Sequence, residues 1–297
     1  MKTLEKCEFR TISMEDEEEV ERIRSMSGET SSSYSFPVLF CWQEELGLSI
    51  CVEEDCFTVK YAMAGERDYF FPCGKPERVK EAIDRLLLQD EGVRFHFISE
   101  KNREFLQETY GEELLFLDED RASCDYVIDV EKFLALRGKE YSKIRYYINK
   151  VRRQRQIRFL PIKPSDLSEV LEIEARWEME RDTMDMADEK AQQMVLAHYE
   201  ELGMRGILFR ENSRPVGYII GRLLHDDTFD VHFMKKLPDA GRIDFYMLYI
   251  LCRMLKGYVD YVNLEDDMGH EGLREKKLLY RPEEYQKVYI GVVGENE

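Results

Sequence analysis

A tract near the end of the chain concentrates side chains that could do acid–base chemistry. Residues 263–282 read Asn-Leu-Glu-Asp-Asp-Met-Gly-His-Glu-Gly-Leu-Arg-Glu-Lys-Lys-Leu-Leu-Tyr-Arg-Pro. Strand propensity before the tract, carboxylates next and a periodic stretch stopped by Pro282 predict a strand end, an acidic turn and a helix. Carboxylates, a helix start and a tyrosine would then meet at a strand end, as in a ligand site. An ordinary strand-to-helix turn with a solvated acidic loop explains the local pattern equally well.

Length and composition favour two soluble domains. The chain has 297 residues, of which 43% are hydrophobic and 12% aromatic, enough to bury a core in each half. Every apolar stretch is shorter than the roughly 18 residues of a membrane span, and helix candidate 245–255 contains Arg253. Residues 1–9 carry charges and no apolar core of a signal peptide. The sequence therefore predicts a cytoplasmic protein without stable membrane insertion.

The cysteines and histidines carry no metal motif. Seven cysteines form no Cys-x-x-Cys pair, and their odd number suits reduced thiols. The five histidines are scattered along the chain, so each is read as a structural histidine rather than a ligand. We therefore expect no metal ion.

One stretch reverses the acidic character of the chain. The formal net charge is −18, which argues against non-specific binding to nucleic acid or to an anionic membrane. Residues 137–158, however, contain nine basic residues and one acid, Glu140. Such a segment either binds a polyanion or pairs with acidic neighbours inside the protein. The predicted polyanion-binding residues are Lys139, Lys143, Arg145, Arg152 and Arg153.

The periodicity of apolar residues predicts two successive runs of strands and helices. The first half gives strand 9–12, helix 14–26, strands 48–52, 57–64 and 69–72, helix 77–88, strand 93–98, helix 101–110 and strand 126–130. A basic helix, 141–154, joins the halves. The second half gives strand 157–162, helices 167–179 and 188–202, strands 206–210, 216–224 and 228–234, helix 243–255, strand 258–264, helix 271–280 and strand 284–292.

The order of elements in the second half resembles that of the GCN5-related N-acyltransferase (GNAT) fold, and the first half gives a blurred version of it. The expected fold class is α+β with layers of α/β type: two tandem GNAT-like domains with mixed, open sheets flanked by helices. The expected boundaries are 1–136 for the first domain, 137–156 for the basic connecting helix and 157–297 for the second domain.

Three further motifs resemble one bacterial family. They are the run Asp-Tyr-Val-Ile-Asp at 125–129, the pattern Gly-Lys-x-Tyr-x-Lys-x-Arg at 138–145 with Asn149, and the tract 263–282. Residues 36–42 also match an early Phe-x-x-Leu-x-x-Trp pattern. The chain resembles a family of unknown function that shares the C-terminal domain of the phosphatidylglycerol lysyltransferases. That resemblance implies GNAT-like domains related to Fem-type transferases and, as donor, an aminoacyl-tRNA.

The GNAT resemblance also points to a coenzyme A loop, with departures. That loop would lie between strand 228–234 and helix 243–255, where backbone amides would cradle a pyrophosphate. Pro238 and Ile243 depart from the usual pattern, and Asp239 opposes an anion. Binding of coenzyme A or an acyl-CoA would therefore depend on Lys235, Lys236, Gly241 and Arg242.

The function expected from these features is acyl transfer. An acyl or aminoacyl group would pass from acyl-CoA or aminoacyl-tRNA to an amine or hydroxyl of a small molecule or peptide. Glu265 and Asp267 are the candidate bases, and Tyr280 resembles the GNAT tyrosine that protonates the leaving group; a core contact is its alternative role. The expected donor-binding residues of the tract are Asn263, Arg274 and Lys277. The competing interpretation is a non-catalytic ligand-binding or sensing module with the same fold.

Overall fold

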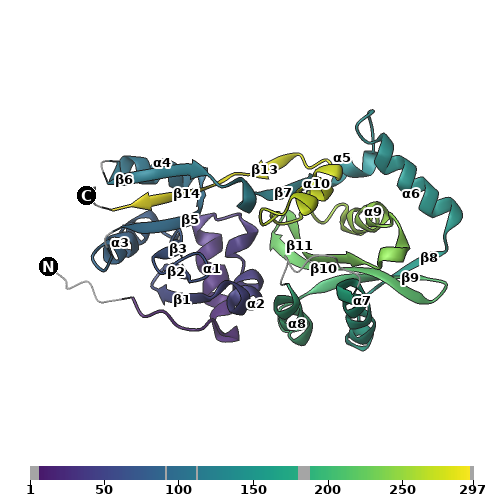
Figure 1. Ribbon diagram of the computed structural model, residues 1–297, viewed down its shortest axis with the longest axis horizontal. Coiled ribbons are helices and arrows are strands. Elements are labelled where there is room, and N and C mark those ends of the chain that lie inside the picture. Colours follow the sequence, from purple (N-terminus) through teal and green to yellow (C-terminus); the bar gives the residue numbers. More distant parts are fainter. Residues whose placement is uncertain (1–6, 91, 112, 180–187, 295–297) are drawn as a thin grey trace. The chain divides into compact units, whose positions relative to one another are not determined.

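The computed structural model describes residues 7–90, 92–111, 113–179 and 188–294, and it contains two compact units (Figure 1). Unit 1 comprises Met1–Asp125, Asp188–Ala191 and Gln286–Glu297. Unit 2 comprises Tyr126–Ala187 and Gln192–Tyr285. Each unit has its own mixed sheet, as the two runs of elements predicted.

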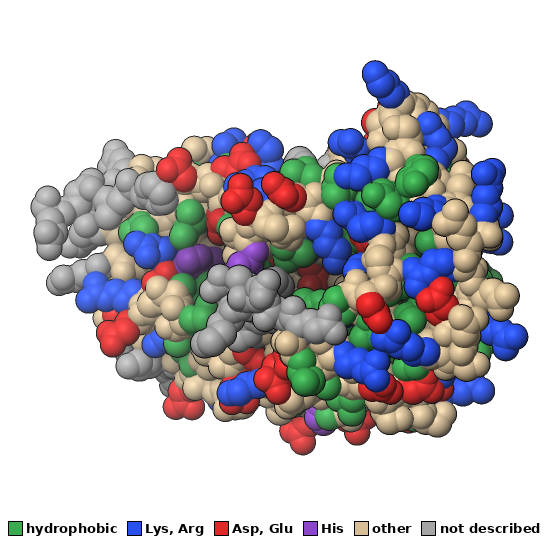
Figure 2. All heavy atoms as spheres, turned by 45° about the vertical axis from the view of Figure 1, so that its right-hand side comes forward, with side chains coloured by type: hydrophobic (Ala, Val, Ile, Leu, Met, Phe, Trp, Pro, Cys, Tyr) green, Lys and Arg blue, Asp and Glu red, His purple; other side chains and the backbone are tan. Residues whose placement is uncertain are grey.

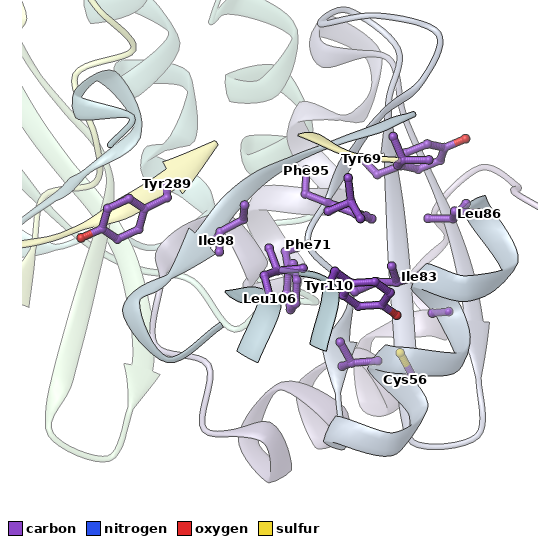
Figure 3. Packing of buried hydrophobic residues seen from close by; sticks show 14 residues of the cluster. Cys56, Tyr69, Phe71, Ile83, Leu86, Phe95, Ile98, Leu106, Tyr110 and Tyr289 are labelled. Carbon is purple, nitrogen blue, oxygen red and sulfur yellow. The ribbon is translucent and has the colours of Figure 1, made fainter. Parts of the chain in front are cut away.

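Unit 1 is a sheet with helices packed against it. The strand order is β1 (Leu48–Glu53), β2 (Cys56–Tyr61), β3 (Asp68–Phe70), β5 (Val93–Ser99), β14 (Val288–Val293) and β6 (Leu114–Glu119), and β4 (Cys73–Gly74) pairs with β2. The helices are α1 (Glu17–Ser27), α2 (Phe36–Leu46), α3 (Pro76–Leu87) and α4 (Glu100–Tyr110). The predicted apolar stripe of α3 is buried, and Ile83 and Leu86 pack with Phe71, Phe95 and Leu106 in the core (Figure 3).

Unit 2 holds a second sheet and six helices among its described residues. The strand order is β13 (Glu284–Gln286), β7 (Asp125–Asp129), β12 (Tyr261–Asn263), β11 (Thr228–Lys236), β10 (Arg214–His225), β9 (Arg205–Glu211) and β8 (Ile157–Pro161). The helices are α5 (Val130–Ala135), α6 (Ser142–Gln154), α7 (Leu167–Met179), α8 (Glu189–Ala197), α9 (Asp244–Leu255) and α10 (Glu271–Leu279).

Two strands pair in the sheet of the other half of the chain, contrary to what their positions in the sequence suggest. β7, from the first half, pairs antiparallel with β12, and β14, from the C-terminus, lies between β5 and β6. The single strand expected at 284–292 is therefore two strands in two sheets. Hydrophobic alternation reports which side chains are buried but not which sheet receives them. The compact units consequently interleave along the chain, whereas the expected boundaries 1–136, 137–156 and 157–297 divide it linearly.

Several smaller expectations are corrected. The strand expected at 9–12 is only an isolated bridge between Arg10 and Ile50, and α2, α5 and β6 were not predicted. Cys7 and Cys51 form a disulfide, where reduced thiols were expected. The other five cysteines are free and buried. No helix of the described part of the chain is long and apolar enough to span a membrane.

Candidate functional site

In unit 2, two parallel strands run side by side and then separate. β11 and β12 pair at Thr228–Tyr261, Phe229–Val262 and Asp230–Asn263, after which β12 ends and β11 continues to Lys236. We call the place just after the Asp230–Asn263 pair the divergence point. Open α/β sheets bind ligands beyond the carboxyl ends of their strands, so the divergence point is the natural place for a site.

A β-bulge shapes one side of the divergence point. Ile220 pairs with Phe233 but Gly221 pairs with Val231, so His232 is the extra residue on β11. A Cβ on Gly221 would meet the carbonyl oxygen of Asp230 at 1.9 Å, and only glycine therefore fits there. The imidazole Nδ1 of His232 lies 2.8 Å from Oε1 of Glu265 and 3.8 Å from Oδ2 of Asp230.

A strained residue shapes the other side. Glu265 has a φ of 57°, in the left-handed region that a glutamate rarely adopts. Its N–H donates to Oδ1 of Asn263 at 2.7 Å, and its carbonyl accepts from the N–H of Tyr126 at 3.1 Å. The predicted donor-binding residue Asn263 is fully buried and orients this backbone instead. The predicted base Glu265 therefore reaches the divergence point, where it meets His232 and Asp230.

Asp267, the second predicted base, is built into the framework. It is fully buried, and Arg274 donates to both of its oxygens at 2.8 and 2.9 Å, while the Tyr126 hydroxyl donates to Oδ2. Burial opposes ionisation, but these hydrogen bonds hold the pKa of the Asp267 carboxyl below its ordinary value. Lys277 donates to the carbonyls of Leu264 and Asp266. Arg274 and Lys277, expected to hold donor phosphate, thus hold the acidic turn in shape.

Tyr280 lies in the core of unit 2. Its side chain is 1% exposed, its ring makes an edge-to-face contact with Phe245 at 5.5 Å, and its hydroxyl donates to Oδ2 of Asp244 at 3.3 Å. Burial and the nearby carboxylate raise the pKa of Tyr280 well above its ordinary value. These contacts agree with the alternative role that the sequence analysis gave Tyr280, a packing contact in the core.

Three cations surround the start of α9. They are Lys236, Arg242 and Lys276, and each interacts electrostatically with the buried Asp244 at the first turn of the helix. Burial lowers the pKa of Lys276 to about 8. The positive charge of Lys236 lowers this pKa further, whereas the carboxylate of Asp244 raises it. Gly241, with a φ of 64°, directly precedes Arg242. Three of the expected coenzyme-binding residues, Lys236, Gly241 and Arg242, therefore lie near the start of α9.

Lys235 does not join this group. It is buried, its Nζ lies 2.9 Å from Oε2 of Glu174, and it sits 4.2 Å from the ring centroid of Trp177. Lys276 replaces it, and helical spacing could have identified this lysine. Lys276 is four residues before Tyr280, and both side chains interact with Asp244, whereas Arg274 and Lys277 bond to the acidic turn.

The basic residues around α6 form an exposed surface rather than internal ion pairs. Ile144, Ile148 and Val151 are buried, whereas the basic residues of the helix, with Tyr146, cover its outer sides (Figure 2). Between residues 139 and 158, on α6 and its two flanks, six cations are exposed and make no ion pair with a carboxylate in the described part of the chain: Lys139, Lys143, Lys150, Arg152, Arg153 and Arg158. We call them the α6 cationic surface.

Two basic residues of the segment are used internally. Arg145 donates to the carbonyls of Leu136 and Gly138, and Arg155 pairs with Glu211 at 2.5 Å. Of the five residues expected to bind a polyanion, Arg145 therefore supports the preceding turn and the other four belong to the α6 cationic surface.

Comparison with known proteins adds the family and the fold. The family model described as "Phosphatidylglycerol lysyltransferase, C-terminal" matches residues 24–291. No curated protein matches significantly. A conserved protein of unknown function from Bacteroides thetaiotaomicron is similar with a TM-score of 0.86 and 24% identity, covering 97% of this chain and 99% of that one.

More distant structures share the same architecture. L-PGS from Bacillus licheniformis aligns with a TM-score of 0.64 at 12% identity, covering 94% of this chain and 92% of that chain. FemX aligns with a TM-score of 0.59 at 7% identity, covering 96% of each chain. These likenesses establish the fold, and the expected mixed-sheet, GNAT-like and Fem-type architecture is confirmed.

Proposed function

The chain belongs to the family of phosphatidylglycerol lysyltransferase C-terminal domains, and we propose that it is an aminoacyltransferase whose donor is an aminoacyl-tRNA. The observation that carries the proposal is the α6 cationic surface. Six exposed cations gather there although the chain has a net charge of −18. Gathering like charges without acidic partners costs free energy in self-repulsion, and a polyanion would compensate for it.

The α6 cationic surface combines cations with an exposed aromatic ring, a composition typical of surfaces that bind single-stranded RNA. Lys143, Tyr146, Lys150 and Arg153 recur at spacings of three and four residues, so they follow one side of α6. Tyr146 is 60% exposed and could stack on an unpaired base, while the cations meet backbone phosphates. A surface of this length suits several consecutive phosphates better than the three of a coenzyme.

An acyl-CoA donor is the second candidate. The observation that favours it is the group of cations at the start of α9, where Lys236, Arg242 and Lys276 would meet a pyrophosphate at a helix N-terminus. Pro238 and the short 3₁₀ turn that contains it occupy the position of a glycine-rich loop and remove one backbone donor. We therefore rank this donor below aminoacyl-tRNA.

We assign the reaction to the divergence point. Attack of an acceptor amine or hydroxyl on the donor ester needs removal of a proton and stabilisation of charge on the carbonyl oxygen. Of the three predicted catalytic residues, Glu265 is the one at the divergence point, together with His232 and Asp230. Asp267 and Tyr280 are bonded within the framework, and we give them structural roles.

Charge reversal on α6 tests the donor. We expect Arg152→Glu with Arg153→Glu to weaken binding of aminoacyl-tRNA by at least tenfold. Wild-type binding should fall with salt with a slope on the order of −0.7 to −0.9 per phosphate neutralised, and the double variant should lose about two phosphates from that slope. Binding of coenzyme A, measured in parallel, should change little. The matched control reverses Arg78 and Lys80 of α3, which are exposed and paired with acids.

Two outcomes would contradict the proposal. If tRNA affinity is unchanged and coenzyme affinity falls, the donor is an acyl-CoA. If the labelled aminoacyl group stays on bound tRNA with every amine, hydroxyl and peptide acceptor supplied, the chain is a binding module, as the alternative interpretation holds.

A further inference from the structure

We propose that Asp230, His232 and Glu265 form a binding site for a divalent transition-metal ion, with Zn²⁺ the expected occupant. The three side chains come from β11 and from the turn after β12, and they meet at the divergence point. Binding of the ion is a property of unit 2 alone, and only its part in catalysis rests on the proposed function.

The spacing of the donor atoms suits a single ion. One nitrogen or oxygen from each residue lies within 4.8 Å of the others, with 2.8 Å from His232 Nδ1 to Glu265 Oε1 and 3.8 Å from that nitrogen to Asp230 Oδ2. Ligands about 2.1 Å from a zinc ion stand roughly 3.4 Å apart in a tetrahedral site. Small rotations of the Glu265 and Asp230 carboxylates would therefore bring all three donors around one ion.

The backbone aims two of these donors by unusual means. The bulge on β11 turns His232 out of the regular alternation, and it is possible only because residue 221 is a glycine. Glu265 adopts its left-handed conformation with the support of hydrogen bonds to Asn263 and from Tyr126. A left-handed conformation of a residue other than glycine is strained and occurs mostly at functional sites, and β-bulges are also frequent next to such sites. Two unusual features that converge on one point indicate selection for that point.

The donor set identifies the class of ion. One imidazole and two carboxylates match borderline ions such as Zn²⁺ and Mn²⁺ better than Ca²⁺ or Mg²⁺, which prefer oxygen alone. Three protein ligands leave at least one position open, as in catalytic rather than structural zinc sites. The open position would be available to the carbonyl oxygen of a donor ester or to the acceptor. Glu265 would then be a ligand, where the sequence predicted a base.

Metal binding to the tag-free full chain tests the proposal. After removal of ions with a chelator, we expect one equivalent of Zn²⁺ to bind in calorimetry, and Co²⁺ to give the visible absorption of a coordinated ion. Glu265→Gln and Asp230→Asn nearly conserve the shape of the side chain but remove its negative charge. Each should weaken Zn²⁺ binding by about 100-fold or more, as expected when a residue that contacts the ion loses its charge. Glu265 is partly exposed, so its variant should fold even if Asp230→Asn does not, as circular dichroism would verify.

Two controls make the result specific. His96 in unit 1 also contacts a buried carboxylate, Asp68, at 2.6 Å, and His96→Gln should leave Zn²⁺ binding unchanged. Cys7, Cys51 and Glu53 form the other candidate group among the described residues, so the titration is repeated without reductant and with Cys7→Ser. Failure of the wild type to bind either ion, or equal binding by Glu265→Gln, would overturn the proposal. Zinc binding without tRNA binding would leave it standing and would overturn the proposed function instead.

Discussion

Each unit contains a pair of parallel strands that is followed by a residue with a positive φ, but the side chain of that residue differs between the units. In unit 1, β3 and β5 pair up to Phe70 and His96, and the next residue, Phe97, has a φ of 55°. In unit 2, β11 and β12 pair up to Asp230 and Asn263, and the positive φ belongs to Glu265. The same local conformation therefore directs a phenyl ring in one unit and a carboxylate in the other.

The surroundings of the two residues differ accordingly. Phe97 is buried against Phe70, with ring centroids 4.4 Å apart, so the strand ends of unit 1 are filled by core packing. In unit 1, His96 contacts Asp68, and the third charged side chain beside them is the cation Arg94, 3.7 Å from Asp68. In unit 2, the third side chain beside His232 and Asp230 is a second carboxylate, that of Glu265. A duplicated fold thus keeps packing at one site and polar chemistry at the other, and function must be argued from the site.

Removing a buried charge of unit 2 should have the largest effect. Asp267→Asn would leave Arg274 without its ionic partner; breaking a fully buried pair costs about 3–5 kcal/mol, and because Arg274 is 34% exposed the cost should lie near the lower end of that range. The pKa of Asp267 is lowered in the folded state, so its contribution is present above the ordinary carboxyl pKa and is lost as the pH falls through the folded value. Urea unfolding of wild type and variant at pH 7 and pH 3 would measure this, and the difference should shrink at pH 3. A variant as stable as the wild type at pH 7 would show that the acidic turn is not held by this pair.

A methyl group at the bulge should have the next largest effect. Gly221→Ala places a Cβ against the backbone of Asp230, and overpacking of this kind costs about 1–3 kcal/mol. The strand would regain regular pairing, and His232 would turn away from Glu265. The measurement is the thermal transition together with Zn²⁺ affinity. Gly272, whose added Cβ would meet nothing within 4 Å, is the control position for Ala. Loss of stability with full Zn²⁺ affinity would separate the bulge from the site.

Most elements of unit 2, although not α5, could be predicted because their signals are local. Apolar spacing along α6 identified the buried Ile144, Ile148 and Val151, and the acidic turn before α10 was expected from its sequence. The exchange of β7 and β14 could not be predicted, because pairing partners far apart in the chain leave no local pattern.

The proposed site could be predicted only in part, for a related reason. Glu265 was among the predicted residues, but its contact His232 lies 33 residues before it and was read as structural. Gly221 inside an apolar strand is the signal that could have indicated a bulge there. Arg274 and Lys277 were assigned to a ligand because their hydrogen bonds to the acidic turn depend on how α10 packs against that turn, which a sequence pattern does not show.

Neighbouring lysines of α10 should respond with opposite signs. The pKa of Lys276 is lowered to about 8, so between pH 8 and the unfolded value of 10.5 the unfolded chain binds more protons and stability rises with pH. Lys276→Met should remove this rise and stabilise the protein at pH 7. Lys277→Met should destabilise it, because the carbonyls of Leu264 and Asp266 lose their donor. Melting temperatures from pH 7 to 10.5 test both, and a loss of stability in Lys276→Met at pH 7 would contradict the burial of its charge.

The smallest effect is expected at Tyr280, and it decides between the two roles that the sequence left open. Tyr280→Phe keeps the ring against Phe245 and removes one hydrogen bond to Asp244, at 3.3 Å a long one, so it should cost about 1 kcal/mol or less. Aminoacyl transfer should change less than threefold, whereas loss of a general acid lowers turnover by roughly 10²-fold or more. The raised pKa and full burial of Tyr280 favour the smaller change, because the hydroxyl neither ionises readily nor meets solvent. A fall of 10²-fold in turnover with unchanged donor affinity and unchanged unfolding would return Tyr280 to the catalytic site and move the reaction from the divergence point toward α9.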